Sequence, residues 1–209
     1  MVKLRSLVRM GIAIYANILD PVVSMQKLKA KIPLRKEILA VFSTAVFISF
    51  SWSIYRMFFQ VPSWVFYLTL NDILWISAYV VGFALLESAL LLGFMLLLSI
   101  LFPQKHFMSK FVAQSTLILL VLTIGALLYQ QNIGMLKWWG WLELLIFILA
   151  FIASLTLLII SFSFLFDRLA RLKGLIEAIA DRLTVFSLIY IPLGVLGLIV
   201  MLFRNLFSL

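Results

Sequence analysis

The chain has 209 residues, of which 65% are hydrophobic and only 12% are charged, and it contains no cysteine. A soluble domain is about half apolar and a quarter charged, so this composition excludes a water-soluble globular protein. The formal net charge of +9 would suggest nucleic-acid binding in a soluble chain. In a membrane protein, a basic excess is instead typical of cytoplasmic loops that face anionic lipid.

Residues 1–37 precede the first long apolar run and are predicted to form a cytoplasmic segment. Within 1–18, apolar residues recur at helical spacing between basic ones, which predicts an amphipathic helix on the inner leaflet. Asp20-Pro21 would end that helix, because proline disfavours helical geometry in the residue before it. Five basic residues then lie close to the membrane and are expected to contact anionic headgroups: Lys27, Lys29, Lys31, Arg35 and Lys36.

Five runs with few or no charges are long enough to cross the hydrocarbon core, which takes a helix of about 20 apolar residues. They are residues 38–55, 73–102, 111–129, 138–166 and 183–203. Lipid offers the backbone no hydrogen-bond partner, and five segments are too few for a barrel, so all five are predicted to be helices. The expected fold is therefore an all-α, polytopic membrane helix bundle that occupies residues 38–209.

The distribution of basic residues predicts the orientation of these spans. Fourteen of the 17 Lys and Arg residues fall in the N-terminal segment and in the loops 103–110 and 167–182. This places the N-terminus in the cytoplasm and the C-terminus outside. All six tryptophans then belong to the outer side, as a headgroup anchor or as an aromatic surface that docks a partner or lipid. Residues 57–71 contain Pro62, are too short to span, and are expected to lie along the outer interface or to dip into it.

The loop 167–182 is predicted to form an amphipathic helix on the inner side. Its charges include two opposite pairs four residues apart, Asp167–Arg171 and Lys173–Glu177, which support an exposed helix. Its apolar residues step by three and four, which is the spacing of a packing seam: Leu169, Leu172, Ile176, Ile179 and Leu183. The seam packs either on the inner leaflet, as part of a helical hairpin, or on another subunit.

Glu87 lies near the middle of the second apolar run. An ionised carboxylate at mid-bilayer costs about 3 kcal/mol, and ionisable groups within spans are candidates for function. Gln114 is a possible hydrogen-bond donor to it, and small neighbours such as Ser88 permit close helix approach. Glu87 is therefore either a neutral group that joins helices through hydrogen bonds or a site for transport, proton transfer or partner binding.

Four charged residues fall near the outer ends of the spans: Arg56, Asp72, Glu143 and Arg204. Ion pairing or snorkelling to the headgroups explains them, and an outward vestibule of mixed charge is the alternative. In the fifth span, Pro192 with Gly194 and Gly197 predicts a kink or a point of tight helix packing.

The chain lacks the residue patterns of the common catalytic and metal sites. Without cysteine there is no thiol nucleophile or thiolate ligand, and the single histidine, His106, cannot build a metal site alone. No glycine-rich phosphate loop, paired-histidine motif or nucleophile elbow occurs. We therefore expect no enzymatic activity, no cofactor and no metal.

The layout resembles the Yip family, five-span membrane proteins of eukaryotic vesicles with bacterial relatives. The local likeness lies in ILDPVVSMQKL (residues 18–28) before the first span and in the short loop FPQKHFMSKF (residues 102–111). A basic N-terminal region on the inside and a chain that ends at the fifth span complete it. The resemblance implies an adaptor or membrane-organising role.

These observations predict an accessory, scaffolding or adaptor subunit in a bacterial plasma membrane. Its expected partners are the anionic lipids of the inner leaflet and another membrane or cytoplasmic protein, with no nucleic acid. The alternative is a small transporter or channel component that uses Glu87.

Overall fold

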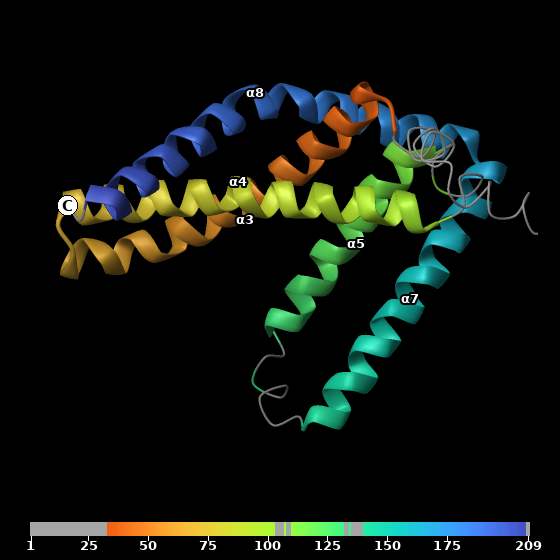
Figure 1. Cartoon of the computed structure of the whole chain (residues 1–209), viewed down its shortest axis with the longest axis horizontal. Helices are drawn as coiled ribbons and strands as arrows, with labels where there is room; N and C mark the ends of the chain where they lie inside the picture. Colours follow the sequence, from red (N-terminus) through yellow and green to blue (C-terminus); the bar gives the residue numbers. More distant parts are fainter. Residues whose placement is uncertain (1–32, 103–106, 108–109, 132–133, 135–139, 208–209) are drawn as a thin grey trace, which may run out of the picture.

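The computed structural model describes residues 33–102, 107, 110–131, 134 and 140–207, and no strand occurs in these ranges. Five helices are long and apolar enough to cross a membrane. In chain order they are α3 (Arg35–Tyr67), α4 (Leu70–Leu101), α5 (Phe111–Gln131), α7 (Trp141–Arg168) and α8 (Ala170–Phe207) (Figure 1). The predicted all-helical fold is confirmed, with five helices that are long and apolar enough to span a membrane. The helix predicted within 1–18, Lys27, Lys29, Lys31 and His106 lie outside the described residues.

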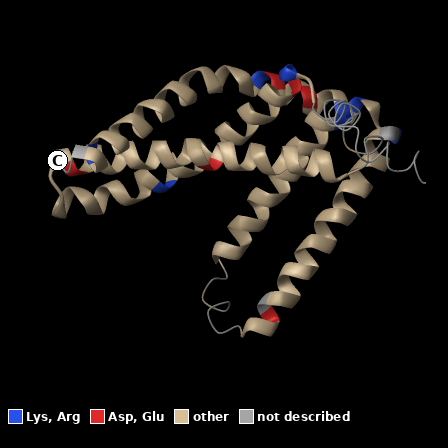
Figure 2. Ribbon diagram, in the orientation of Figure 1, with Lys and Arg blue, Asp and Glu red and all other residues tan. Residues whose placement is uncertain are grey.

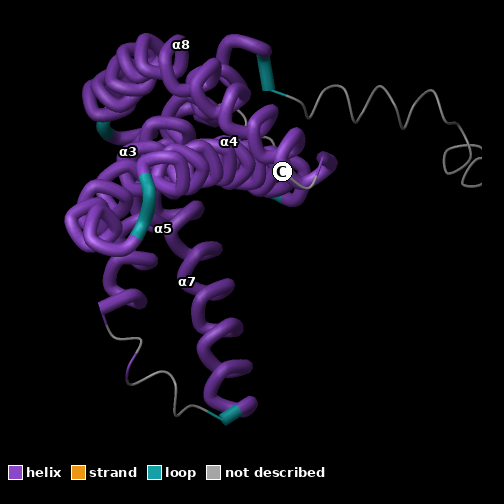
Figure 3. Tube along the Cα trace, turned by 90° about the vertical axis from the view of Figure 1, so that its left-hand side faces the viewer, coloured by secondary structure: helices purple, strands orange, loops and turns teal. Residues whose placement is uncertain are grey.

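Helices α3, α4 and α8 form one long bundle, and α5 and α7 form a hairpin that leans away from it (Figures 1 and 3). The five helices meet where α3, α5 and α8 begin and where α4 and α7 end, which we call the convergent end. The opposite end of the bundle, where α3 and α8 end and α4 begins, is called the far end. Seven of the nine described Lys and Arg residues lie at or near the convergent end, and Arg56 and Arg204 lie toward the far end (Figure 2).

Helix α3 is longer than the sequence suggested. The first span was expected to close at Arg56, but α3 continues to Tyr67 and includes Pro62. The stretch 57–71 is not a separate segment between two helices, because it comprises the last part of α3, a turn and the start of α4. One proline removes a single backbone hydrogen bond and blocks one carbonyl, and the uncharged residues on either side of it continue the helix.

The turn between α3 and α4 consists of Leu68 and Thr69, and Thr69 caps α4. The Asp72 backbone N–H donates to Thr69 Oγ1 (3.3 Å), and the Thr69 backbone N–H donates to Asp72 Oδ2 (3.2 Å). This reciprocal pair is a capping box, which satisfies two N–H groups at the start of the helix. Asp72, predicted as an outer-end charge, thus serves as a cap residue.

Helix α8 runs without interruption for 38 residues from Ala170 to Phe207. The segment 167–182, predicted as a separate loop helix, comprises the end of α7, Leu169 and the first third of α8. The predicted Lys173–Glu177 pair is present with an N–O distance of 3.7 Å. The side chain of Asp167 lies outside the described residues.

Helices α4 and α8 pack closely at glycines, as expected for the region after Pro192. A Cβ atom added to Gly197 would lie 2.5 Å from the Ala78 carbonyl oxygen and 2.8 Å from the Gly82 nitrogen. A Cβ atom on Gly194 would lie 2.7 Å from Leu85 Cβ. Small residues of this kind let helix backbones approach each other in membranes, where van der Waals packing drives association.

The buried core is concentrated toward the convergent end. One apolar cluster joins α3, α4, α5 and α7, and a smaller one joins α5, α7 and α8. Helix α7 contributes to them through its second half, with Ile159, Ser163 and Phe166 as its buried residues and Leu155 and Leu158 as partly buried ones. In the most apolar stretch of α7, 6% of the residues are buried inside the chain, whereas 44% are buried in the corresponding stretch of α3. The hairpin is therefore attached to the bundle at one end.

Candidate functional sites

Glu87 lies in the middle part of α4 and lines a pocket of about 280 Å³ between α3, α4 and α5. The polar residues that line the same pocket are Ser49 on α3 and Thr123 and Gln130 on α5, and most of the remaining lining is apolar. The Glu87 side chain is exposed to this pocket, and within the described ranges it forms no hydrogen bond or ion pair. The pocket therefore presents one carboxyl group among hydroxyl and amide groups.

The two residues predicted to accompany Glu87 bond elsewhere. Ser88 is fully buried, and its hydroxyl donates to the Ala84 carbonyl oxygen of its own helix at 2.6 Å. Gln114 is also fully buried, and its Nε2 donates to the Ile159 carbonyl oxygen of α7 at 3.3 Å. Gln114 thus belongs to the α5–α7 contact. The polar α5 residues that share a pocket with Glu87 are Thr123 and Gln130.

Lys110 is a buried cation that the sequence analysis assigned to a loop. It is only 8% exposed, and its Nζ donates to the Ser163 carbonyl oxygen at 2.8 Å. Lys110 and Gln114 are four residues apart and both donate to α7, so together they fasten the start of α5 to the last third of α7. The spacing of a lysine and a glutamine four residues apart at the start of an apolar run is the signal that sequence reasoning missed.

Several buried side-chain oxygens on α3 and α5 have no protein hydrogen-bond partner in the described part of the chain. They are Ser43 Oγ, Ser49 Oγ, Gln114 Oε1, Ser115 Oγ and Thr116 Oγ1. Buried polar groups are nearly always paired in folded proteins. The buried parts of α3 and α5 therefore contain several polar atoms without a protein partner.

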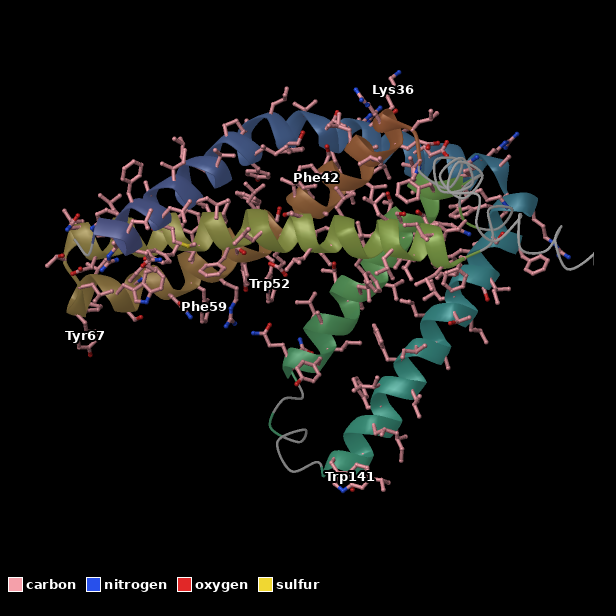
Figure 4. The ribbon with its side chains drawn as sticks, viewed as in Figure 1. Lys36, Phe42, Trp52, Phe59, Tyr67 and Trp141 are labelled. Atoms are coloured by element: carbon pink, nitrogen blue, oxygen red, sulfur yellow. The ribbon has the colours of Figure 1, made fainter. Side chains whose placement is uncertain are left out.

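Aromatic and basic side chains gather toward the far end. Figure 4 shows Trp52, Phe59 and Tyr67 along the second half of α3. The Arg56 guanidinium lies 5.9 Å from the Trp52 ring centroid, and the Arg204 guanidinium lies 5.2 Å from that of Trp75. Of the four predicted outer-end charges, Arg56, Asp72 and Arg204 belong to this end. The fourth, Glu143, belongs to the first turn of α7, at the tip of the hairpin.

The predicted seam on the early part of α8 is divided between packing and exposure. Ile176 is 7% exposed and packs with Ala113 and Phe166, and Leu172 packs against the same cluster. Ile179 and Leu169 are nearly half exposed, and Leu183 is partly buried. Contacts within the chain thus account for Leu172 and Ile176. Arg35 and Lys36, in the first turn of α3, are exposed nearby.

The described residues contain no group of three or more His, Cys, Asp or Glu side chains that could hold a metal ion. Comparison of the chain with protein-family models, curated proteins and solved structures finds no match.

Proposed function

We propose that this chain is a non-catalytic accessory, scaffolding or adaptor subunit of a membrane complex, and that α7 binds a membrane-spanning helix of another protein. The observation that carries this proposal is the one-sided burial of α7. Its buried residues Ile159, Ser163 and Phe166 all face the rest of the chain, and every residue before Leu155 whose side chain the structure describes is exposed. The adaptor role implied by the layout of the Yip family agrees with it.

The outward face of α7 has the composition of a helix-packing surface. Nine residues correspond to about 180° around a helix, so Ala150, Ser154 and Leu157 lie opposite the three buried residues. Ala150 and Ser154 are exposed and four residues apart. A pair of small residues at this spacing lets two membrane helices come into close contact.

The experiment compares two substitutions that place the same large side chain on exposed helix positions. Ser154→Leu would fill the proposed contact, and Ala89→Leu adds the same bulk to an exposed site on α4. We expect one partner to co-purify in fixed stoichiometry with the unaltered chain and with Ala89→Leu, and to be lost from Ser154→Leu. Retention of that partner by a folded Ser154→Leu variant would contradict the proposal.

We further propose that the convergent end faces the cytoplasm of a bacterial plasma membrane. This rests on the bias of Lys and Arg toward that end, since cytoplasmic loops carry the excess of basic residues. Exposed Arg35 and Lys36 would then lie beside the anionic inner leaflet.

A second candidate function is that of a small transporter or channel component, and the Glu87 pocket favours it. A carboxyl group that lines a pocket among hydroxyl and amide side chains can bind a cation or exchange a proton. Purified protein in liposomes loaded with a pH-sensitive dye separates the two candidates. Proton or cation flux from the chain alone would support transport, and a flux no faster than that of empty liposomes supports the accessory role.

A further inference from the structure

A groove of about 620 Å³ lies between α3, α4 and the end of α8. Most of its lining is aromatic or apolar, including Trp52, Trp64 and Phe83. The charged residues in the lining are two arginines, Arg56 from α3 and Arg204 from α8, and the lining contains no Asp or Glu. Two guanidinium groups from helices far apart in the sequence therefore face one largely apolar groove.

Neither guanidinium group forms an ion pair in the part of the chain that the structure describes. Asp72 attracts Arg204 electrostatically. The Asp72 carboxylate, however, accepts hydrogen bonds from the Thr69 hydroxyl (2.6 Å) and the Thr69 backbone N–H. Two cations that share a groove repel each other. An anion placed between them would relieve it.

Aromatic rings position both arginines. Arg204 lies over the rings of Trp75 (5.2 Å) and Tyr79 (5.9 Å), and the Tyr79 hydroxyl donates to Asn205 Oδ1 at 3.1 Å. Arg56 lies over Trp52. Stacking of this kind occupies the flat face of a guanidinium group and leaves the N–H groups at its edge free to donate to phosphate oxygens. The groups are thus arranged for an anion before it binds.

The position of the groove along the helices matches the depth of lipid phosphates. From Lys36 to Arg56 on α3, and from Arg182 to Arg204 on α8, the rise is about 30 Å and about 33 Å. These distances equal the thickness of the hydrocarbon core. When the basic residues of the convergent end lie at one headgroup layer, Arg56 and Arg204 therefore lie at the other, where tryptophan is also enriched.

We propose that this groove binds an anionic phospholipid, with its phosphate held between Arg56 and Arg204. One acyl chain would lie along the apolar lining formed by Met57, Ile76, Val80 and Phe83. A small soluble anion would satisfy the guanidinium groups and leave that lining uncovered. The combination of two cations and an apolar wall is specific to an amphiphile.

The test measures lipid binding to purified protein by native mass spectrometry. Short-chain phosphatidylglycerol is the probe, phosphatidylcholine with the same chains tests the need for net negative charge, and glycerol phosphate tests for a soluble anion. The double variant Arg56→Gln/Arg204→Gln is compared with Arg35→Gln/Arg182→Gln. The control changes the same two helices by the same charge at exposed residues of the convergent end.

We expect the Arg56/Arg204 variant to bind phosphatidylglycerol about tenfold or more weakly, because charge-assisted hydrogen bonds from two arginines are lost. The control should stay within about twofold of the unaltered chain. Arg56→Lys/Arg204→Lys should fall between the two, because lysine keeps the charge but lacks the paired N–H donors of a guanidinium group.

Equal losses in the two glutamine variants would overturn the proposal, as would binding of glycerol phosphate as tight as that of the lipid. If the double variant does not fold, Arg56→Gln alone decides, since that side chain is exposed. Unchanged affinity there contradicts the proposal.

Discussion

At the scale of single residues, the attachment of the α5–α7 hairpin depends on two donors of unequal strength. Lys110 donates over 2.8 Å to the carbonyl oxygen of Ser163, and Gln114 donates over 3.3 Å to that of Ile159. Both side chains are buried. A short hydrogen bond from a cation contributes more than a long one from a neutral amide, so the two positions are expected to differ in their effect on stability.

Lys110→Met should destabilise the folded chain more than Gln114→Leu does. The lysine variant loses a charge-assisted bond, which is worth about 1.5–3 kcal/mol. The glutamine variant loses a long bond but also removes Oε1, a buried oxygen without a protein partner, so its change should stay below about 1 kcal/mol. Thermal unfolding of both variants in the same detergent measures the order. A larger loss for Gln114→Leu would mean that the amide is the main fastening.

Glu87→Gln should leave the fold and the binding of the proposed partner intact. The amide has the same size, and no hydrogen bond to the carboxyl group occurs within the described ranges, so the change in unfolding free energy should be less than about 1–2 kcal/mol. The measurements are thermal unfolding, co-purification of the partner and flux in liposomes. A folded Glu87→Gln protein that has lost a flux present in the unaltered chain, with partial flux in Glu87→Asp, would instead establish the transport candidate.

At the scale of the helices, contacts between α4 and α8 are set by glycines, and those between α8 and the hairpin by a short apolar seam. Gly197 lies against the backbone of α4, which cannot move aside as a flexible side chain can. Ile176 is enclosed by α5 and α7, whereas Ile179, one turn further on, is nearly half exposed. A substitution at Gly197 or at Ile176 is therefore expected to destabilise the chain more than the same substitution at an exposed position.

Gly197→Ala should destabilise the chain by about 1–3 kcal/mol, the usual cost of an overpacked contact. The new Cβ atom would lie 2.5 Å from the Ala78 carbonyl oxygen, so the two backbones must separate. Gly93→Ala is the matched control, since no atom lies within 4 Å of a Cβ atom added there. It should be neutral or slightly stabilising because alanine favours helix. Equal effects at both glycines would show that α4 and α8 do not pack as described.

Ile176→Glu should reduce the yield of folded protein, and Ile179→Glu should be tolerated. The first variant places an unpaired carboxyl group in a closed apolar cluster, which costs several kcal/mol. The second places it on an exposed surface near the basic end. Size-exclusion profiles of the two purified variants compare them. A well-folded Ile176→Glu protein that has lost a partner would indicate that the seam docks another subunit.

The sequence predicted the number of spanning helices and the basic end, because both follow from the content of apolar and charged residues. It did not predict the extension of α3 past Pro62, although the T-x-x-D pattern at Thr69–Asp72 marks where α4 begins. It also misplaced the partners of Glu87. Helices that are apolar all round carry no pattern that indicates their rotation, so which polar residues meet between helices is decided by packing at residues such as Gly194 and Gly197.

At the scale of the whole molecule, the bundle is longer than the membrane is thick and the hairpin is not. Helix α3 has 33 residues and spans about 50 Å, whereas α5 has 21 residues and spans about 32 Å. With the convergent end at the inner surface, the part of α3 beyond Arg56 extends past the opposite headgroups. Ser63 lies in this part, about 10 Å beyond Arg56 along the helix.

This arrangement predicts which residues a membrane-impermeant thiol reagent reaches in intact cells. The chain has no cysteine, so single substitutions report one position each. Ser63→Cys, exposed on the extension of α3, should be labelled from outside, and Ala178→Cys, exposed near the start of α8, only after the membrane is permeabilised. Labelling of Ala178→Cys alone in intact cells would reverse the orientation. It would also place the Arg56–Arg204 groove at the inner leaflet and the basic convergent end outside. The rule that cytoplasmic loops carry the excess of basic residues could then no longer explain the basic convergent end.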